Sequence, residues 1–235
     1  MDSVYIVMPA YNEEQNIESV VKEWYAVLED KGENSRLVVA DSGSTDQTHE
    51  ILQELQLVYP RLDVINNTDK QHGPKVIALY DYAIKNQADY VFQTDSDGQT
   101  NPAEFDAFWN MRKQYEGIFG YRNKREDGRV RAFTEKVVCI LLKMYFDVNI
   151  PDANAPFRLM KVDTVKKYLY RMRKDYNLPN IMMTTYFVYY REKYAFKTIT
   201  FKNRRGGVNS INILHIINIG WHSLADFRDL RKGMR

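Results

Sequence analysis

The sequence predicts an α/β fold in which a doubly wound, mostly parallel sheet has helices on both faces. Short apolar runs rich in β-branched residues alternate with longer segments whose apolar residues recur at helical spacing. Strands that alternate with helices of this length pair in parallel through right-handed crossovers. With 235 residues, 44% of them hydrophobic, the chain can bury one continuous core but is too short for two full domains.

The alternation is regular over the first half of the chain and becomes mixed after about residue 115. A later stretch, 133–146, is expected to be a helix whose apolar residues Phe133, Val137, Ile140, Leu141 and Met144 pack into the core. The expected elements of the first half are a strand at 4–8, a helix at 12–28, a strand at 37–40, a helix at 48–57, a strand at 62–65, a helix at 75–86 and a strand at 90–93.

Charge and cysteine content narrow the classes of function. The 33 Lys and Arg residues nearly balance the 31 Asp and Glu residues, so the net charge of +2 argues against a nucleic-acid partner. The single cysteine cannot form an internal disulfide, and no basic leader precedes the first strand, so a cytoplasmic setting is expected. No window has the roughly 20 apolar residues that cross a bilayer. Any membrane contact is therefore expected at the surface, on its inner face.

Polar loops follow three of the expected strands, at residues 9–13, 41–46 and 94–99. Ligands of such sheets bind at the carboxyl ends of the strands. In the third loop Asp95, Asp97 and Gln99 occupy alternate positions and share one face if the chain is extended. Their oxygens suit Mg²⁺ or Mn²⁺. The spacing alone is equally compatible with an Asp-rich turn.

Three motifs in this order give the chain a family resemblance. They are 8–13 (MPAYNE), 39–46 (VADSGSTD) and 95–99 (DSDGQ). Together they resemble the family 2 inverting glycosyltransferases of the GT-A fold.

The resemblance implies that Pro9, Tyr11 and Glu13 line a nucleotide pocket and that Asp41 hydrogen-bonds the base or ribose. Lys75 lies in a segment that family members place close to the donor, where it could meet a phosphate. Asp46, by contrast, is expected to cap the following helix.

The second half resembles a narrower group, the polyprenyl-phosphate sugar transferases that include dolichol-phosphate mannose synthase. Arg122, Arg131 and Arg204 match arginines that meet phosphates of donor or lipid there, and guanidinium groups suit bidentate phosphate contacts. Asp152 matches the region of the general base. No carboxylate stands at 180–184, where many hydroxyl-glycosylating relatives have an acidic pair. This absence favours an acceptor that needs little deprotonation, such as a phosphate.

These observations lead to one hypothesis and two alternatives. The hypothesis is a metal-dependent inverting glycosyltransferase that takes sugar from a GDP- or UDP-sugar to a polyprenyl phosphate. The alternatives are a transferase that extends a surface glycan and a non-catalytic scaffold that binds nucleotide sugars. The expected domain spans 1–210, with a donor half to about 115 and an acceptor half from 116. An amphipathic helix over 211–235 is expected to contact the membrane or to pack within the protein or a homodimer.

Overall fold

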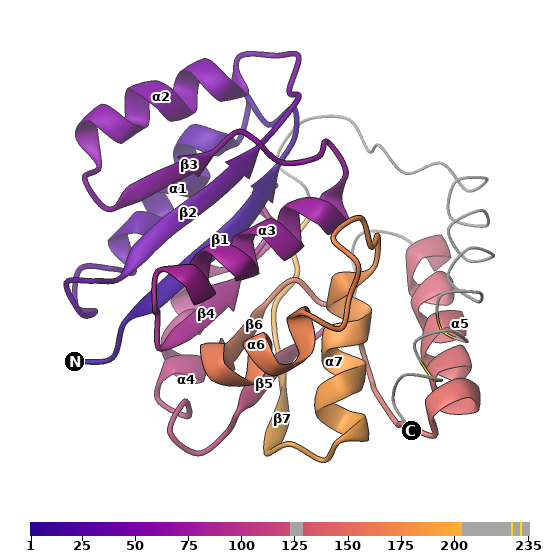
Figure 1. Cartoon of the computed structure of the whole chain (residues 1–235). Helices are drawn as coiled ribbons and strands as arrows, with labels where there is room; N and C mark the ends of the chain where they lie inside the picture. Colours follow the sequence, from indigo (N-terminus) through magenta and orange to yellow (C-terminus); the bar gives the residue numbers. More distant parts are fainter. Residues whose placement is uncertain (123–128, 204–226, 228–230, 232–235) are drawn as a thin grey trace.

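In the computed structural model, one sheet of seven strands is described, with helices on both of its faces (Figure 1). The structure describes residues 1–122, 129–203, 227 and 231, and the backbone alone at 129–133. The strands are β1 (Val4–Ala10), β2 (Arg36–Asp41), β3 (Leu62–Ile65), β4 (Tyr90–Gln93), β5 (Gly117–Tyr121), β6 (Arg158–Lys161) and β7 (Tyr194–Thr198). The helices are α1 (Ile17–Ala26), α2 (Thr48–Val58), α3 (His72–Lys85), α4 (Phe105–Trp109), α5 (Arg129–Phe146), α6 (Val162–Leu169) and α7 (Pro179–Tyr189), with a 3-10 turn at Pro102–Glu104.

The strand order is β3-β2-β1-β4-β6-β5-β7. β1 pairs in parallel with β2 on one side and with β4 on the other, and β5 pairs in parallel with β7. Only β6, among the described strands, runs antiparallel to its neighbours β4 and β5. The predicted mostly parallel α/β sheet is therefore confirmed. Because β6 is reversed, the segment that precedes it arrives at the edge where the parallel strands end.

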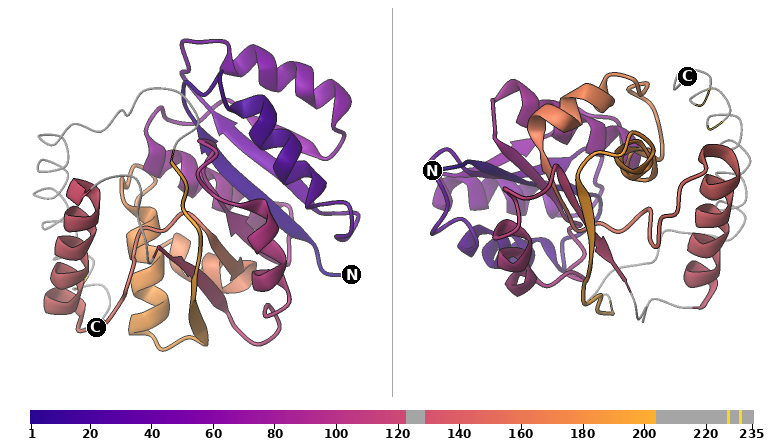
Figure 2. Two further views of the ribbon diagram at one scale, coloured as in Figure 1. Left: turned by 180° about the vertical axis from the view of Figure 1, so that it is seen from behind. Right: turned by 90° about the horizontal axis from the view of Figure 1, so that it is seen from below.

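Helices lie on both faces of the sheet (Figure 2), and a hydrophobic cluster fills the space on each face. α3, α6 and α7 pack on one face, and α1, α2 and α4 on the other. Side chains of each strand alternate between them, so that Val91 joins the first cluster and Phe92 the second. Phe92 is fully buried, and its ring centroid lies 5.3 Å from that of Trp24 and 4.7 Å from that of Phe157.

The first strand is longer than the sequence predicts, since it continues through Pro9 to Ala10. Pairing of β1 with β4 ends at Val7, whose carbonyl accepts from the Thr94 backbone. The backbone nitrogen of Pro9 faces β4, as the carbonyl of Val7 does, but it lies beyond the last residue of β1 that pairs with β4. The N–H group that proline lacks is therefore not needed for a sheet hydrogen bond. α3 likewise begins at His72, three residues before the predicted start, because Pro74 is tolerated in a first turn.

The predicted buried stripe of α5 is wrong. Val137, Ile140 and Met144 are 38%, 59% and 71% exposed, whereas Leu142 and Phe146 are buried. The buried face is thus rotated around the helix from the one predicted, because both faces of this segment contain apolar residues and periodicity alone does not choose between them. Phe227, one of two described residues of the predicted C-terminal helix, packs on Phe146 with ring centroids 5.8 Å apart. The rest of that predicted helix lies outside the described residues.

No helix within the described ranges is long and apolar enough to span a membrane.

Replacing Phe92 with Ala is expected to lower the free energy of unfolding by about 3–5 kcal/mol, because it removes a fully buried ring from an aromatic cluster and leaves a cavity. Urea unfolding at 25 °C measures this change. Phe92→Leu, which keeps most of the volume, is the control and should cost less than half as much. A loss below about 1 kcal/mol in Phe92→Ala would show that the cluster is not tightly packed.

Candidate active site

The three polar loops predicted from the sequence meet at the carboxyl ends of β1, β2 and β4. Ser96 donates from Oγ to the carbonyl oxygen of Pro9 at 2.8 Å, which joins the β4 loop to the β1 loop. The backbone N–H of Asn12 donates to Ser44 Oγ at 3.0 Å, and the backbone N–H of Thr45 donates to the side-chain oxygen Oδ1 of Asn12 at 2.8 Å. These bonds join the β1 and β2 loops. The loops therefore form one structural unit along this edge of the sheet.

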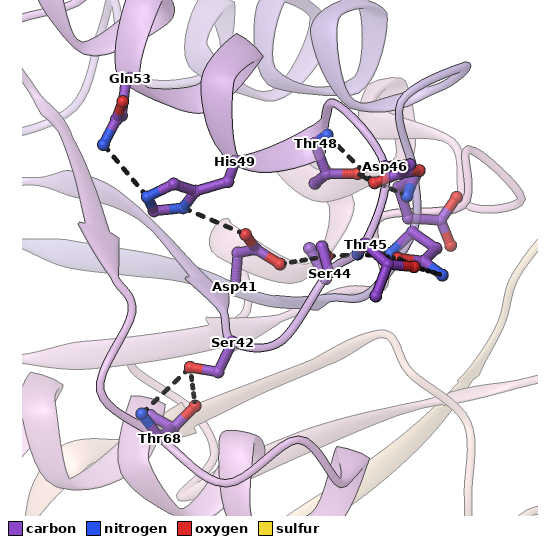
Figure 3. Close-up of polar contacts among 12 residues, drawn as sticks. Asp41, Ser42, Ser44, Thr45, Asp46, Thr48, His49, Gln53 and Thr68 are labelled. Atoms are coloured by element: carbon purple, nitrogen blue, oxygen red, sulfur yellow. Dashed lines mark hydrogen bonds and ion pairs between the residues drawn. The ribbon is translucent and has the colours of Figure 1, made fainter.

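Asp41, the last residue of β2, is 2% exposed and is bonded on both carboxylate oxygens (Figure 3). Ser44 donates from Oγ to Oδ1, and the His49 ring nitrogen Nδ1 lies 3.3 Å from Oδ2. Gln53 Nε2 lies 3.1 Å from His49 Nε2 on the far side of the ring. Asp41 is thus a fixed acceptor at the end of the central strands, and His49 from α2 is a partner that sequence reasoning missed.

The start of α2 is fixed to the same loops. Asp46 accepts from the Thr48 amide at 3.1 Å and from Thr48 Oγ1 at 2.6 Å. Asp46 was expected to cap this helix, but Gln47 occupies the cap position and Asp46, one residue earlier, bonds to Thr48, the first residue of the helix. Thr48 Oγ1 in turn accepts from the Glu13 amide at 2.8 Å. The Glu13 side chain is buried and accepts from Asn16 Nδ2 at 2.8 Å, so it supports the entry into α1.

Lys75 lies beneath the β1 loop and not on an open surface. Its side chain is almost completely buried, and Nζ donates to the Ala10 carbonyl oxygen at 2.6 Å. The ammonium group also lies 5.2 Å from the centre of the Tyr11 ring, which is itself 45% exposed. Burial lowers the pKa of Lys75 to about 8, and the charges of Asp41 and Asp69 oppose that effect. In this position Lys75 stabilises the loop that contains Tyr11.

The carboxylates after β4 are the candidate metal ligands. Asp95 Oδ1 is buried and has no hydrogen-bond partner in the described part of the chain, and His72 Nε2 at the start of α3 lies 3.7 Å away. Asp97 Oδ1 accepts from the Gln99 amide at 3.1 Å. Gln99 is buried, and its Nε2 donates to the Lys202 carbonyl oxygen at 2.8 Å, so its amide group also holds the segment that follows β7.

Within the described ranges, no three His, Cys, Asp or Glu side chains gather closely enough to hold a metal ion by themselves. A pair of carboxylates with a buried, unbonded oxygen nevertheless fits a hard divalent cation that takes its remaining ligands from phosphate and water. Mg²⁺ in particular is commonly held by one or two carboxylates together with substrate phosphates.

Arg122 and Asp152, both predicted as site residues, form a buried ion pair. Arg122 Nε donates to Asp152 Oδ2 at 2.7 Å and Nη2 to Oδ1 at 2.8 Å. Glu135 of α5 lies 3.8 Å from the same guanidinium group and accepts from the Ala153 amide at 2.8 Å. Asp152 precedes the reversed strand β6 and Arg122 follows β5, which explains how residues 30 apart meet. Both Asp152 oxygens accept from the same guanidinium group.

Arg158, the first residue of β6, fixes the loop that contains Asp152. It is 1% exposed and donates from Nη2 to the Ala155 carbonyl at 2.6 Å and from Nη1 to the Asn180 carbonyl at 2.8 Å. The Asn180 side chain accepts from Tyr80 Oη at 3.2 Å, where the resemblance places an acidic pair in other relatives. Arg158 therefore links β6, α7 and the 153–155 loop. Its position inside the apolar run 157–160 was the one available signal for this structural role.

Two predicted arginines cannot be placed. The side chain of Arg131 at the start of α5 and the whole of Arg204 lie outside the described residues. The other predicted site residues all lie on or beside the loops at this edge of the sheet or at the β5–β6 side of it.

The sequence model of glycosyl transferase family 2 matches residues 5–194. This chain is a family 2 glycosyltransferase. The match covers the whole edge at which the three loops meet and extends through α7, so the predicted family resemblance and enzyme class are confirmed.

Two curated proteins are similar to this chain in sequence. An uncharacterized glycosyltransferase, YkcC of Bacillus subtilis, is 31% identical over 158 residues, which cover 66% of this chain and 48% of that protein. The undecaprenyl-phosphate 4-deoxy-4-formamido-L-arabinose transferase of Shewanella sediminis is 26% identical over 174 residues, 72% of this chain and 51% of the relative. The matched part of the present chain thus corresponds to about half the length of each of these two curated relatives.

Solved structures share the fold. Glucosyl-3-phosphoglycerate synthase of Mycobacterium tuberculosis, in complex with Mn²⁺, UDP and phosphoglyceric acid, superposes with a TM-score of 0.71 at 15% identity. The superposition covers 98% of this chain and 78% of the synthase. The complex of the same synthase with Mn²⁺ and UDP-glucose gives a TM-score of 0.70 at 14% identity, covering 98% of this chain and 79% of that one. The glycosyltransferase therefore has the GT-A fold.

The buried lysine leads to a prediction about pH. Lys75 titrates at about 8 in the folded protein and near 10.5 when unfolded, so the unfolded chain binds more protons between these values. The contribution of Lys75 to the free energy of unfolding therefore rises with pH across this window. We expect wild type to gain about 1 kcal/mol per pH unit relative to Lys75→Met, below the ceiling of about 1.4 because Lys75 is only partly deprotonated near pH 8 in the folded protein.

Urea unfolding of both proteins between pH 7.5 and 9.5 measures this difference. Lys166→Met, a change at an exposed lysine, is the control and should follow the wild-type curve. If wild type and Lys75→Met stay parallel throughout, the ammonium group is not buried in the folded enzyme.

Proposed function

We propose that this enzyme transfers a sugar from a GDP- or UDP-sugar to a phosphate-bearing acceptor, by preference a polyprenyl phosphate, with inversion at the anomeric carbon. The observation that supports it most directly is the meeting of Tyr11, Asp41 and the Asp95–Asp97 pair at one edge of the sheet. These are an exposed ring, a fixed hydrogen-bond acceptor and two carboxylates. A nucleoside diphosphate has a base, a ribose and a diphosphate to match them.

The diphosphate end of the donor belongs near Asp97 and Asp95, which would hold Mg²⁺ or Mn²⁺. When bound, such an ion neutralises negative charge that develops on a departing diphosphate. The chain's own contribution is placement. Ser96, between the two carboxylates, bonds to Pro9, and the Gln99 amide bonds to Asp97, so the loop is fixed before a donor arrives. The structures that resemble this one include complexes with Mn²⁺ and UDP-glucose, which is consistent with this assignment.

In the proposed reaction an acceptor oxygen attacks the anomeric carbon from the face opposite the leaving group. The new bond joins that oxygen to the anomeric carbon, while the bond to the diphosphate breaks and its electron pair leaves on the diphosphate oxygen. A phosphate oxygen is already anionic at neutral pH, so no proton must be removed. The site then has only to hold donor and acceptor in line.

Three observations favour a phosphate acceptor over a hydroxyl group. Asp152, the predicted base, has both oxygens bonded to Arg122, and Asn180 is buried in a hydrogen-bonded network with no carboxylate. Several curated relatives are named as undecaprenyl-phosphate transferases. We therefore assign Arg122 and Asp152 to shaping the acceptor side, and propose Arg131 and Arg204 as contacts to phosphate.

An acceptor with a polyprenyl chain requires access to a membrane surface. The exposed face of α5 has suitable chemistry, because it contains the exposed apolar residues Val137, Ile140 and Met144. The neighbouring Lys136 and Lys143 are exposed too. Apolar side chains flanked by lysines suit the interface of an anionic bilayer. Glu135 on the other side of the same helix contacts Arg122, so this face lies close to the acceptor side.

Asp97→Ala is expected to lower kcat/KM for donor turnover by at least about 100-fold, because a charge-stabilising group is lost, while the unfolding midpoint stays unchanged. Turnover is measured across a panel of UDP- and GDP-sugars with Mn²⁺ and with EDTA. Asp97→Asn, which keeps the shape and removes the charge, should behave like the alanine variant. Full activity in either variant, or wild-type activity that EDTA leaves intact, would remove the metal from the proposed mechanism.

The full chain is expected to sediment with phosphatidylglycerol liposomes at low salt. A chain that ends at Asn209 lacks the amphipathic helix expected over 211–235 and is expected to remain in the supernatant, because the face of α5 alone is too small to hold it on the bilayer. Replacing Ile140 and Met144 together with Glu should weaken sedimentation several-fold, since each change puts a charge into the apolar face. Leu57→Glu with Val58→Glu, at exposed apolar positions of α2, is the matched control and should sediment like wild type. A full chain that stays soluble and transfers sugar only to a glycan would contradict both the membrane contact and the lipid acceptor.

A further inference from the structure

The segment that directly follows β7, residues 199–202, contacts both the proposed donor side and the proposed acceptor side of the site. This post-β7 segment begins beside β5, where the backbone N–H of Ile199 donates to the Tyr121 carbonyl oxygen at 3.0 Å. Glu104 accepts from the Thr200 backbone N–H at 3.1 Å and from Thr200 Oγ1 at 2.7 Å. The Ile199 side chain is only 4% exposed, so the segment is packed against the domain where it leaves the sheet.

Gln99, in the loop after β4, holds this segment through two hydrogen bonds of opposite direction. The backbone N–H of Lys202 donates to the Gln99 backbone carbonyl oxygen at 2.9 Å, and Gln99 Nε2 donates to the Lys202 carbonyl oxygen at 2.8 Å. Because a carbonyl oxygen only accepts, the nitrogen of the side-chain amide must face Lys202, and Oε1 then faces away from that carbonyl. The backbone N–H of Gln99 donates to Asp97 Oδ1 at 3.1 Å. Gln99 therefore bonds to the carboxylate loop and to the post-β7 segment at the same time.

The post-β7 segment reaches the acceptor side through Phe201, the residue before Lys202. The central carbon of the Arg122 guanidinium group lies 5.0 Å from the centre of the Phe201 ring, and Phe201 is 5% exposed. A cation is attracted to the face of an aromatic ring, and more strongly when water is excluded. The same guanidinium group donates to both oxygens of Asp152. A shift of Lys202 away from Gln99 would therefore move the ring that lies against this ion pair.

We infer that Gln99 is a positioning residue that couples the two sides of the site, because through Lys202 it holds the Phe201 ring against Arg122. The inference rests on the proposed function, in which the carboxylates after β4 hold a cation and Arg122 shapes the acceptor side. A glutamine suits this role, since its amide has a donor for a carbonyl oxygen and an oxygen of the kind that divalent cations take. Acceptor binding thus depends on a residue of the donor-side loop.

Hydrogen exchange of the full chain, measured by NMR without any ligand, tests the positioning role. In Gln99→Glu, which keeps an oxygen but loses the donor, the backbone N–H of Lys202 should exchange about fivefold faster, as expected for the loss of one hydrogen bond. The Nε–H group of Arg122 should also exchange faster. Phe201→Leu should speed exchange at Arg122 more than at Lys202. Thr198→Ala, at the exposed end of β7, is the matched control and should change neither.

Transfer to undecaprenyl phosphate gives the functional measurement, with the donor that a panel of UDP- and GDP-sugars identifies. Gln99→Glu should raise the KM for this acceptor about five- to tenfold, while the dissociation constant of the donor's nucleotide with Mn²⁺ stays within about threefold of wild type. Gln99→Leu, which has no oxygen for a cation, should weaken both. The double variant with Gln99→Glu and Phe201→Leu should raise the acceptor KM little beyond the larger single effect, because both changes act on one contact.

Unchanged exchange at Lys202 and Arg122 in Gln99→Glu would overturn the positioning role. Faster exchange with an unchanged acceptor KM would overturn the coupling to the acceptor and leave the proposed transfer intact. If wild type transfers sugar to no phosphate acceptor, the proposed function fails, and the exchange rates still decide whether Gln99 holds Arg122 in place. Thermal unfolding identifies any variant that misfolds, and Phe201→Leu then tests the same contact from its other end.

Discussion

The candidate site depends on the parallel pairing of β1 with a neighbour on each side. Parallel strands end at the same edge of a sheet, so pairing β1 with both β2 and β4 brings three loops together that are separated by up to 85 residues of chain. The loops then bond to one another through side chains, as Ser96 does to Pro9 and Asn12 to Ser44. Asp41 and the Asp95–Asp97 pair owe their proximity to this pairing.

Buried cations also hold the loops of the candidate site in place. Lys75 and Arg158 are both almost completely buried, and each donates to backbone carbonyl oxygens of a loop at the site. A buried cation that bonds to carbonyl groups opposes movement of the loop, because losing the contact leaves the charge without a partner. The site loops are thus held from below by cations that themselves have little access to a substrate.

How much the sequence predicted differs between the halves of the chain. The first four strands and three helices were placed to within a few residues, because hydrophobic periodicity and loop signals agree there. The reversal of β6 was not foreseen, since nothing in the four residues 158–161 encodes direction. The wrong stripe on α5 has a related cause. Its two faces are both partly apolar, so only the tertiary contact with Phe227 and the core decides between them.

Prediction of the site residues had the same limits. Motif resemblance identified Asp41, Asp95 and Asp97 but said nothing about the groups that bond to them. His49 and Glu135 stand outside every motif, and their roles follow from helices that the fold places beside the loops. Lys75 was expected to meet a phosphate, and its bond to Ala10 shows a supporting position instead. The burial of Lys75 depends on how α3 packs on β1, and a local sequence motif does not predict that packing.

The single reversed strand also separates two groups of candidate site residues. The printed bonds to the Asp41 side chain come from Ser44 and His49, in the β2 loop and α2, whereas Arg122, Glu135 and Asp152 come from the segments around β5 and β6. Changes in length or sequence before β6 alter the second group and leave the parallel ladder of β1 untouched. Under the proposed function these two groups are the donor and acceptor sides, so the acceptor side could vary without altering the strand pairing that supports the donor side.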